Sequence, residues 1–195
     1  KEKDVLGCPT TGTVPVESTA KSFAGGVVGN SASGRAAGCR NDGTVICGGN
    51  NSGVGGVVGE NEYLPIQHDP ITVENCCNTG SINVTGSVDS NVGGIVGLAG
   101  NPNGRVTVTV ENCENTGKVT VGGKGLIGGI VGRANGGSTV SNCRNSGDIS
   151  ANKEGNSIPG GIVGENYGAI FRCYNTGAVT GAVTGDGATG GIAGR

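Results

Sequence analysis

Hydrophobic and polar positions along this chain follow one phrase that recurs from end to end. Each copy starts with two glycines, two aliphatic residues and a third glycine, as in Gly160–Gly164. It continues to a cysteine that is followed by a corner of the Asn-Thr-Gly type, as in Cys173–Gly177. Earlier glycine pairs begin at Gly25, Gly55, Gly93 and Gly128, and their cysteines are Cys39, Cys76, Cys113 and Cys143. A fixed period of this size is typical of stacked repeats, in which each unit buries its apolar side against its neighbours.

The two arms of this repeat differ in how constant their lengths are. From each cysteine to the second glycine of the next pair the chain takes 16–18 residues, whereas the return arm takes 12–20. The insertions therefore lie in the return arm. Cys8 fits the cysteine phrase with Thr10 in place of the asparagine, so the chain holds six units.

Three short β-like stretches are expected in each unit. The first is the Gly-Gly-aliphatic segment itself. The second ends at the cysteine and has an aliphatic residue three positions before it, namely Val5, Ala36, Val73, Val110, Val140 and Ile170. The third follows the corner and carries two columns spaced by two positions: Val14, Val45, Ile82, Val119, Ile149 and Val179, then Val16, Cys47, Val84, Val121, Ala151 and Gly181. A spacing of two places both columns on one face of a strand, and the β-branched residues and glycines disfavour helix.

This pattern predicts an all-β fold, a parallel, right-handed β-helix (β-solenoid) of about six coils of 30–38 residues. Strands of successive units would pair in register, and parallel connections within one sheet are right-handed in nearly all cases. We expect residues 1–195 to form a single solenoid domain that belongs to a larger surface protein. The Asn-Thr-Gly triplet would be a corner in which asparagine tolerates, and glycine readily adopts, the left-handed backbone conformation. The corner asparagines would stack as a polar ladder formed by Asn41, Asn78, Asn115, Asn145 and Asn175.

The cysteines follow the repeat rather than a disulfide framework. Six of the eight occupy one repeat position (Cys8, Cys39, Cys76, Cys113, Cys143 and Cys173), and Cys47 falls in an aliphatic column. Stacked residues on adjacent coils point the same way, which is poor geometry for a disulfide. We therefore expect buried thiols that act as small hydrophobic side chains.

Composition and charge exclude several classes of partner. Glycine accounts for 43 of 195 residues, aromatic residues for 3%, and Trp and Met are absent, so the core must be a narrow stack of Val, Ile, Ala and Cys. The net charge of −2 comes from interspersed acids and bases without the basic stripe of nucleic-acid-binding proteins, so we expect no nucleic-acid partner. No apolar run approaches the ~18–20 residues of a membrane helix, and we expect no membrane insertion of this segment.

Motifs that carry catalysis or bind cofactors are not found in the sequence. The chain has a single histidine, no Gly-Lys-Ser/Thr phosphate loop and no Cys-x-x-Cys metal motif, so we expect no enzyme activity, metal or cofactor. Glu60, Glu62 and Asp69 lie near His68 in one long return arm, where a solvated insertion explains them more readily than an active site. The alternative is a carbohydrate-active or carbohydrate-binding β-helix protein, and the enzyme would need two carboxylates on one sheet face.

The two longest return arms provide the candidate ligand site. They run from Gly59 to Asn75 and from Gly97 to Asn112 in consecutive units, so stacking would place their insertions side by side. Together they offer an aromatic and polar mix suited to a sugar or a peptide, formed by Tyr63, His68, Asn101, Asn103 and Arg105. Loops on a rigid scaffold are where binding residues concentrate.

The repeat phrase resembles the GLUG motif of large bacterial surface proteins, including the non-catalytic repeat region of immunoglobulin A proteases. The resemblance is strongest in Gly160–Ile170 followed by Cys173–Gly181, covers essentially Cys8 to Gly194, and is weakest in the first unit, which lacks the corner asparagine. It implies an extracellular location at the bacterial cell surface and a structural or adhesive, non-catalytic role. A host glycan or protein would be the partner, and the segment would be a monomeric part of a longer chain. The motif is a fold signature and brings no functional residues with it.

Overall fold

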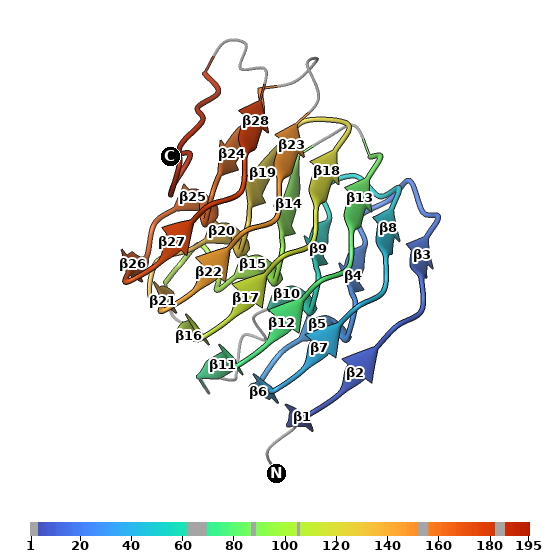
Figure 1. Ribbon diagram of the computed structural model, residues 1–195, viewed down its shortest axis with the longest axis vertical. Helices are drawn as coiled ribbons and strands as arrows, with labels where there is room; N and C mark the ends of the chain where they lie inside the picture. Colours follow the sequence, from blue (N-terminus) through green and yellow to red (C-terminus); the bar gives the residue numbers. More distant parts are fainter. Residues whose placement is uncertain (1–3, 62–69, 87–88, 105, 152–155, 182–185) are drawn as a thin grey trace.

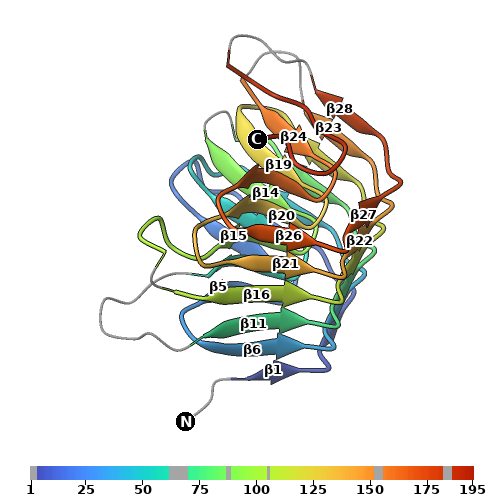
Figure 2. The ribbon, with the colours of Figure 1, turned by 90° about the vertical axis from the view of Figure 1, so that its left-hand side faces the viewer.

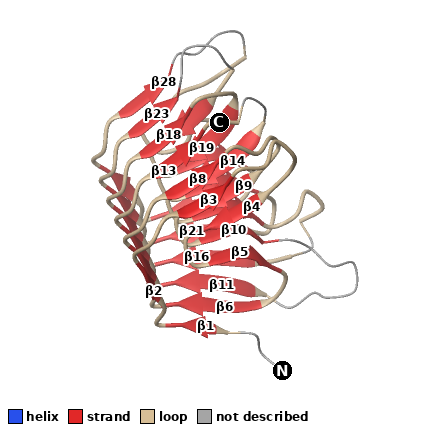
Figure 3. Cartoon of the chain, turned by 90° about the vertical axis from the view of Figure 1, so that its right-hand side faces the viewer, coloured by secondary structure: helices blue, strands red, loops and turns tan. Residues whose placement is uncertain are grey.

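The structure is a computed structural model that describes residues 4–61, 70–86, 89–104, 106–151, 156–181 and 186–195. The described residues form 28 short strands and no helix (Figure 3). Every strand pairs in parallel with its counterparts in neighbouring coils (Figure 1). Depending on the sheet and the coil, the register advances by 30–38 residues per coil. The predicted parallel β-solenoid is therefore confirmed.

Five sheets, here called A to E, run along the solenoid, and each coil visits them in that order. Sheet A, which faces the viewer in Figure 2, holds β1 (Val5–Leu6), β6 (Gly34–Ala37), β11 (Ile71–Glu74), β16 (Val108–Glu111), β21 (Thr139–Ser141) and β26 (Ala169–Phe171). Sheet B holds β2 (Pro9–Thr10), β7 (Arg40–Asn41), β12 (Cys77–Asn78), β17 (Glu114–Asn115), β22 (Arg144–Asn145) and β27 (Tyr174–Asn175). Sheet C holds β3 (Val14–Val16), β8 (Val45–Cys47), β13 (Ile82–Val84), β18 (Val119–Val121), β23 (Ile149–Ala151) and β28 (Val179–Gly181).

Sheets D and E have five strands each. Sheet D holds β4 (Phe23–Gly25), β9 (Gly53–Gly55), β14 (Ser90–Gly93), β19 (Gly125–Gly128) and β24 (Ile158–Gly160). Sheet E holds β5 (Val28–Ser31), β10 (Val58–Asn61), β15 (Val96–Ala99), β20 (Val131–Ala134) and β25 (Val163–Asn166). Single bridges, Gly160 to Gly190 and Val163 to Ala193, add one more rung to each of these two sheets.

The expectation of three β-stretches per unit is wrong, because each full coil contains five. The Gly-Gly-aliphatic segment is a sharp bend between sheets D and E rather than a strand. A β-carbon on Gly55, at this bend, would lie 2.0 Å from the Val58 carbonyl oxygen, so no larger residue fits the fold-back. The strand of sheet A also stops two residues before the cysteine, as at Ala37 before Cys39.

The predicted aliphatic columns are confirmed, and they fill two separate cores. Sheets A and E enclose one core, which includes Val73, Val110 and the buried ladder cysteines. Sheets C and D enclose the other, in which Val119 and Val121 are fully buried. The cross-section of the solenoid therefore has an A/E lobe and a C/D lobe. The return arm of the repeat contributes the strands of sheets E and A, and the constant arm contributes those of sheets B, C and D.

The predicted asparagine ladder forms the waist between the two lobes. Asn41, Asn78, Asn115 and Asn145 are fully buried. Each donates from Nδ2 to Oδ1 of the asparagine in the next coil, at 2.7–2.8 Å. The same nitrogen donates to the carbonyl of the glycine two residues later in its own turn, at 2.8–3.0 Å. Both amide protons are therefore satisfied, which allows a polar group to remain in the core.

The corner glycines are needed for a different reason from the one predicted. The left-handed conformation is not found at Gly80, Gly117 or Gly147. A β-carbon on Gly117 would instead lie 2.0 Å from the carbonyl oxygen of Gly80 in the preceding coil. The close stacking of successive turns, rather than the backbone conformation of a single turn, excludes a side chain here.

The left-handed residue of each coil lies immediately before the ladder cysteine. Its φ is positive in all six coils, at Gly7, Gly38, Asn75, Asn112, Asn142 and Arg172. Glycine and asparagine are the residues that accept this conformation most readily. This corner, between sheets A and B, is where the chain uses the conformational freedom that we expected at the Asn-Thr-Gly triplet.

The cysteine column lies inside the A/E lobe as expected. Cys39, Cys76, Cys113 and Cys143 are at most 1% exposed, and Cys47 is buried in the C/D lobe. All eight thiols are free. Each buried ladder sulfur lies within hydrogen-bond distance of two carbonyl oxygens, one two residues before it and one in the preceding coil, so its single S–H proton has an acceptor without a disulfide.

Candidate functional site

Two of the five predicted ligand residues, Asn101 and Asn103, belong to the described part of the chain. Tyr63, His68 and Arg105 lie outside the described residues. Asn101 is 7% exposed and therefore offers little surface to a ligand. Asn103 is exposed, as predicted, at the tip of the arm between β15 and β16.

Asn103 lines a hollow on the flank of the A/E lobe, which we call the flank hollow. Its volume is about 340 Å³. It is also lined by Pro102 of the same arm, by Arg133 of β20 and Asn135 just after that strand, and by Tyr167 of the following coil. Tyr167 is 58% exposed, and the Arg133 guanidinium lies 5.4 Å from the centre of its ring. The hollow thus combines an aromatic face, a cation and the exposed Asn103 amide, whereas Asn135 is 2% exposed and its Nδ2 donates to the Gly100 carbonyl oxygen at 2.9 Å.

Sequence reasoning missed Tyr167 and Arg133 because they do not belong to the long arms. A signal was available, however. Tyr167 follows the phrase Gly160–Gly164 at the repeat position where the long arms begin. Stacking therefore places short and long arms at the same corner of the solenoid.

A second concavity, the interlobe groove, lies between sheets D and E. It has a volume of about 590 Å³ and takes side chains from all six coils, from Lys21 in the first to Arg195 in the last. Glu60, Leu98, Arg133 and Glu165 come from successive strands of sheet E, and Asn91, Leu126 and Ile158 come from sheet D. At the base of the groove the two sheets touch through glycine, since a β-carbon on Gly97 would lie 2.4 Å from the Val54 nitrogen. Its walls are therefore held at a fixed separation.

Ion pairs neutralise the charges of the groove. Glu165 accepts from Arg195 Nε at 3.0 Å and lies 3.4 Å from Arg133 Nε. Lys21 Nζ lies 3.8 Å from Glu60, and Lys124 Nζ lies 2.8 Å from Asp89. The lining holds four acidic and four basic side chains, so it favours neither anions nor cations.

The interpretation of Glu60 as part of a solvated insertion is wrong. Glu60 belongs to β10 and is 6% exposed, and Glu165 occupies the matching position of β25 at 3% exposed. Ionised carboxylates are buried only when they are paired, and the basic side chains at the groove supply the partners. The neighbouring Glu62, His68 and Asp69 lie outside the described residues.

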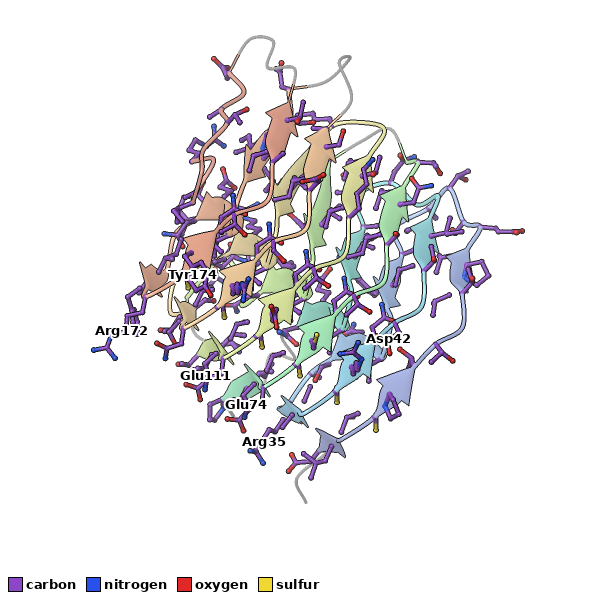
Figure 4. The ribbon with its side chains drawn as sticks, in the orientation of Figure 1. Arg35, Asp42, Glu74, Glu111, Arg172 and Tyr174 are labelled. Atoms are coloured by element: carbon purple, nitrogen blue, oxygen red, sulfur yellow. The ribbon has the colours of Figure 1, made fainter. Side chains whose placement is uncertain are left out.

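Sheet A carries the carboxylate pair that a glycosidase would need. Glu74 and Glu111 are register partners on β11 and β16, which places their strands about 4.8 Å apart. Figure 4 shows both side chains pointing away from the sheet, along one edge with Arg35 and Arg172. Glu74 forms an ion pair with Arg35, and neither glutamate lines the flank hollow or the interlobe groove.

No group of three or more His, Cys, Asp or Glu side chains among the described residues is arranged to hold a metal ion. That part of the chain also holds no helix long and apolar enough to cross a membrane.

Comparison with known proteins identifies one repeat directly. Neither the curated proteins nor the solved structures gave a match to the chain. Residues 123–150 match the family model of the GLUG motif. This stretch runs from just before β19 into β23 and passes once through all five sheets. The chain therefore contains the GLUG motif, and the matched motif is one complete circuit of the solenoid.

Proposed function

We propose that this chain is a rigid, non-catalytic repeat segment with a structural and adhesive role at the bacterial cell surface. The observation that carries this proposal is the unbroken in-register stack, in which the asparagine ladder and the glycine contacts fix each coil to the next. Such a stack transmits force along its axis through many parallel hydrogen bonds. Extended repeat folds of this kind present long binding surfaces.

The arrangement of the carboxylates supports a non-catalytic role. Glu60 and Glu165 in the groove are three strand spacings apart, about 14 Å, whereas glycoside hydrolysis needs carboxyl groups roughly 5–9.5 Å apart. Glu74 and Glu111 are close enough, but they project from a sheet face and Glu74 is engaged by Arg35. Neither pair flanks an enclosed site for a scissile bond.

The flank hollow supports the adhesive part of the proposal. An exposed tyrosine ring beside arginine and asparagine can stack on a sugar ring or a peptide side chain while the polar groups hydrogen-bond it. A host glycan or protein is the proposed partner. Carbohydrate binding is the second candidate function, and the exposed Tyr167 ring is the observation that favours it.

The experiment compares two tyrosines of the same coil. Tyr167 and Tyr174 are 58% and 51% exposed, and each has an arginine 5.4 Å from its ring centre. Beads coated with the intact chain should adhere to host epithelial cells. Tyr167→Ala should reduce adhesion several-fold, and Tyr174→Ala should leave it unchanged. Equal effects of both variants, or no adhesion by the wild type, would contradict the adhesive role. Release of reducing sugars from a polysaccharide panel would contradict the non-catalytic role.

A further inference from the structure

The interlobe groove is a preformed concavity that the flank hollow does not explain. Its walls are two sheets whose backbones touch at Gly59, Gly97, Gly132 and Gly164, so it is neither opened nor closed by side-chain motion. It crosses all six coils and could contact an extended ligand along the solenoid axis. Preorganisation of this kind reduces the entropy that binding costs.

The charges of the groove exclude strongly charged ligands. Its four acidic and four basic side chains cancel, and three of the acids are held in ion pairs. Polyanions such as nucleic acids need a net positive surface. A cation would have to compete with the lysines and arginines already bound to the carboxylates.

The backbone of the groove walls disfavours a peptide bound as an added strand. Strand addition requires a free sheet edge. Within the described residues, the strands of sheets D and E that line the groove use their edges to pair with neighbouring coils along the axis. The groove therefore presents side chains rather than unpaired backbone groups.

The side chains of the groove suit hydroxyl groups. A hydroxyl both donates and accepts hydrogen bonds, so it can bridge a carboxylate and a cation such as Glu165 and Arg133. Asn91 offers both kinds of partner on the opposite wall. Leu126 and Ile158 are register partners on the sheet D wall and form an apolar strip, against which the C–H face of a sugar ring can pack, and Leu98 lies on the sheet E wall.

We propose that the interlobe groove binds a neutral oligosaccharide, laid along the solenoid axis between sheets D and E. The inference builds on the adhesive role proposed above and adds a second site and a class of ligand. Glu165 with Arg133 and Arg195 forms its polar end, and Leu126 with Ile158 forms its apolar strip. Because the charges are already paired within the protein, binding should depend little on salt.

The test uses neutral glucan and mannan hexasaccharides and a heparin hexasaccharide as the polyanionic probe, titrated into the intact chain. Asn91→Trp fills the groove from the middle of β14, and Asn83→Trp places the same side chain on the exposed face of β13 in the same coil. A neutral hexasaccharide should bind the wild type, with affinity changed less than twofold between 50 and 300 mM salt. Asn91→Trp should weaken binding at least tenfold, and Asn83→Trp less than twofold.

A second, smaller change guards against misfolding of the tryptophan variant. Leu126→Asn removes the apolar strip without adding bulk and should weaken binding at least threefold. The groove proposal would be overturned if the heparin hexasaccharide bound and the neutral hexasaccharides did not, or if no hexasaccharide bound. It would also be overturned if a neutral hexasaccharide bound Asn91→Trp and Leu126→Asn as tightly as it binds the wild type. Loss of that binding in Tyr167→Ala alone would place the sugar in the flank hollow, and the adhesive role would then stand without the groove.

Discussion

The side-chain amide of Asn115 lies directly against the backbone of Gly94, across the waist of the solenoid. A β-carbon on Gly94 would be 2.4 Å from Asn115 Cγ. The same contact recurs between Gly26 and Asn41, Gly56 and Asn78, Gly129 and Asn145, and Gly161 and Asn175. The second glycine and the corner asparagine of the repeat phrase are therefore two sides of one contact.

This contact makes the second glycine intolerant of even a methyl group. Replacing Gly94 with Ala should lower the free energy of unfolding by about 1–3 kcal/mol, because the methyl group would overlap the Asn115 amide and would lie 2.0 Å from the Gly129 carbonyl oxygen of the next coil. Urea denaturation followed by circular dichroism measures the change. Gly136→Ala is the matched control, since its β-carbon would meet only ordinary contacts at 3.7 Å. A similar loss in both variants would mean that the waist is not closely packed.

The corner glycine should be equally restricted, because the turns of successive coils stack closely. Gly117→Val should destabilise the protein by more than about 1 kcal/mol, since its side chain would overlap the Gly80 carbonyl of the adjacent turn. Lys118→Val, at the next residue, should change stability by less than about 0.5 kcal/mol because that side chain is exposed. Equal thermal shifts in the two variants would show that the turns do not stack as described.

The asparagine ladder predicts a pH-dependent variant. In Asn115→Asp the carboxylate cannot donate to Asn145 Oδ1 or to the Gly117 carbonyl, and its negative charge would face both oxygens. The folded state should therefore favour the protonated acid and raise its pKa above the unfolded value of about 3.9. The variant should be closest to wild type below about pH 4 and lose stability as the pH rises through the raised pKa. Denaturation series at pH 4 and pH 7 compare the two proteins, and a pH-independent difference would contradict the ladder.

Much of the fold is readable from the sequence because the repeat itself encodes register. Val119 and Val121 could be assigned to one strand face from their spacing alone, and Asn115 to a ladder from its recurrence. The contact between Asn115 and Gly94 could not be predicted from the sequence, because it joins two arms whose relative placement depends on the shape of the whole coil. The left-handed corner was also misplaced. Local propensity favours a left-handed backbone at the Asn-Thr-Gly triplet. The glycine there is instead required because the stacked turns leave no room for a β-carbon.

The candidate sites were less predictable, because they are formed between coils. Tyr167, Arg133 and Asn103 come from three successive coils and share the flank hollow only through stacking. The polar neighbours of Glu60 in the sequence suggest a solvated insertion. Its carboxylate can be buried because it has partners such as Lys21, which is 39 residues away in the sequence. Side-chain chemistry alone does not show which polar residues lie in a groove.

Thiol reactivity should separate Cys77 from the buried ladder cysteines. Cys77 is half-buried on sheet B, whereas Cys39 is 1% exposed; burial raises the pKa of both thiols, so exposure is what distinguishes them. A maleimide added to the native protein should label Cys77, together with the half-buried Cys8 and Cys173, faster than Cys39, and Cys77→Ser should reduce the amplitude of the faster phase. Protein denatured without reductant should titrate at least six thiols. Three or four disulfides found by mass spectrometry would contradict the ladder.

The raised pKa of Cys39 also predicts a pH dependence of stability. Because the thiol ionises less readily in the folded protein than in the unfolded chain, the free energy of unfolding should fall as the pH rises above about 9.

The corner before the ladder cysteine offers a stabilising substitution. Arg172 has φ of 54°, in a column where the three preceding coils have asparagine. The left-handed conformation costs a residue such as arginine about 1–2 kcal/mol, and asparagine is among the residues that tolerate it. Arg172→Asn should therefore raise the free energy of unfolding by about 0.5–1 kcal/mol, measured by thermal and urea denaturation. The reverse change, Asn142→Arg, should destabilise by a similar amount at the equivalent corner, where φ is 52°. Because residue 172 is exposed, the gain should persist at high salt; a gain that disappears there would point to charge rather than to backbone conformation.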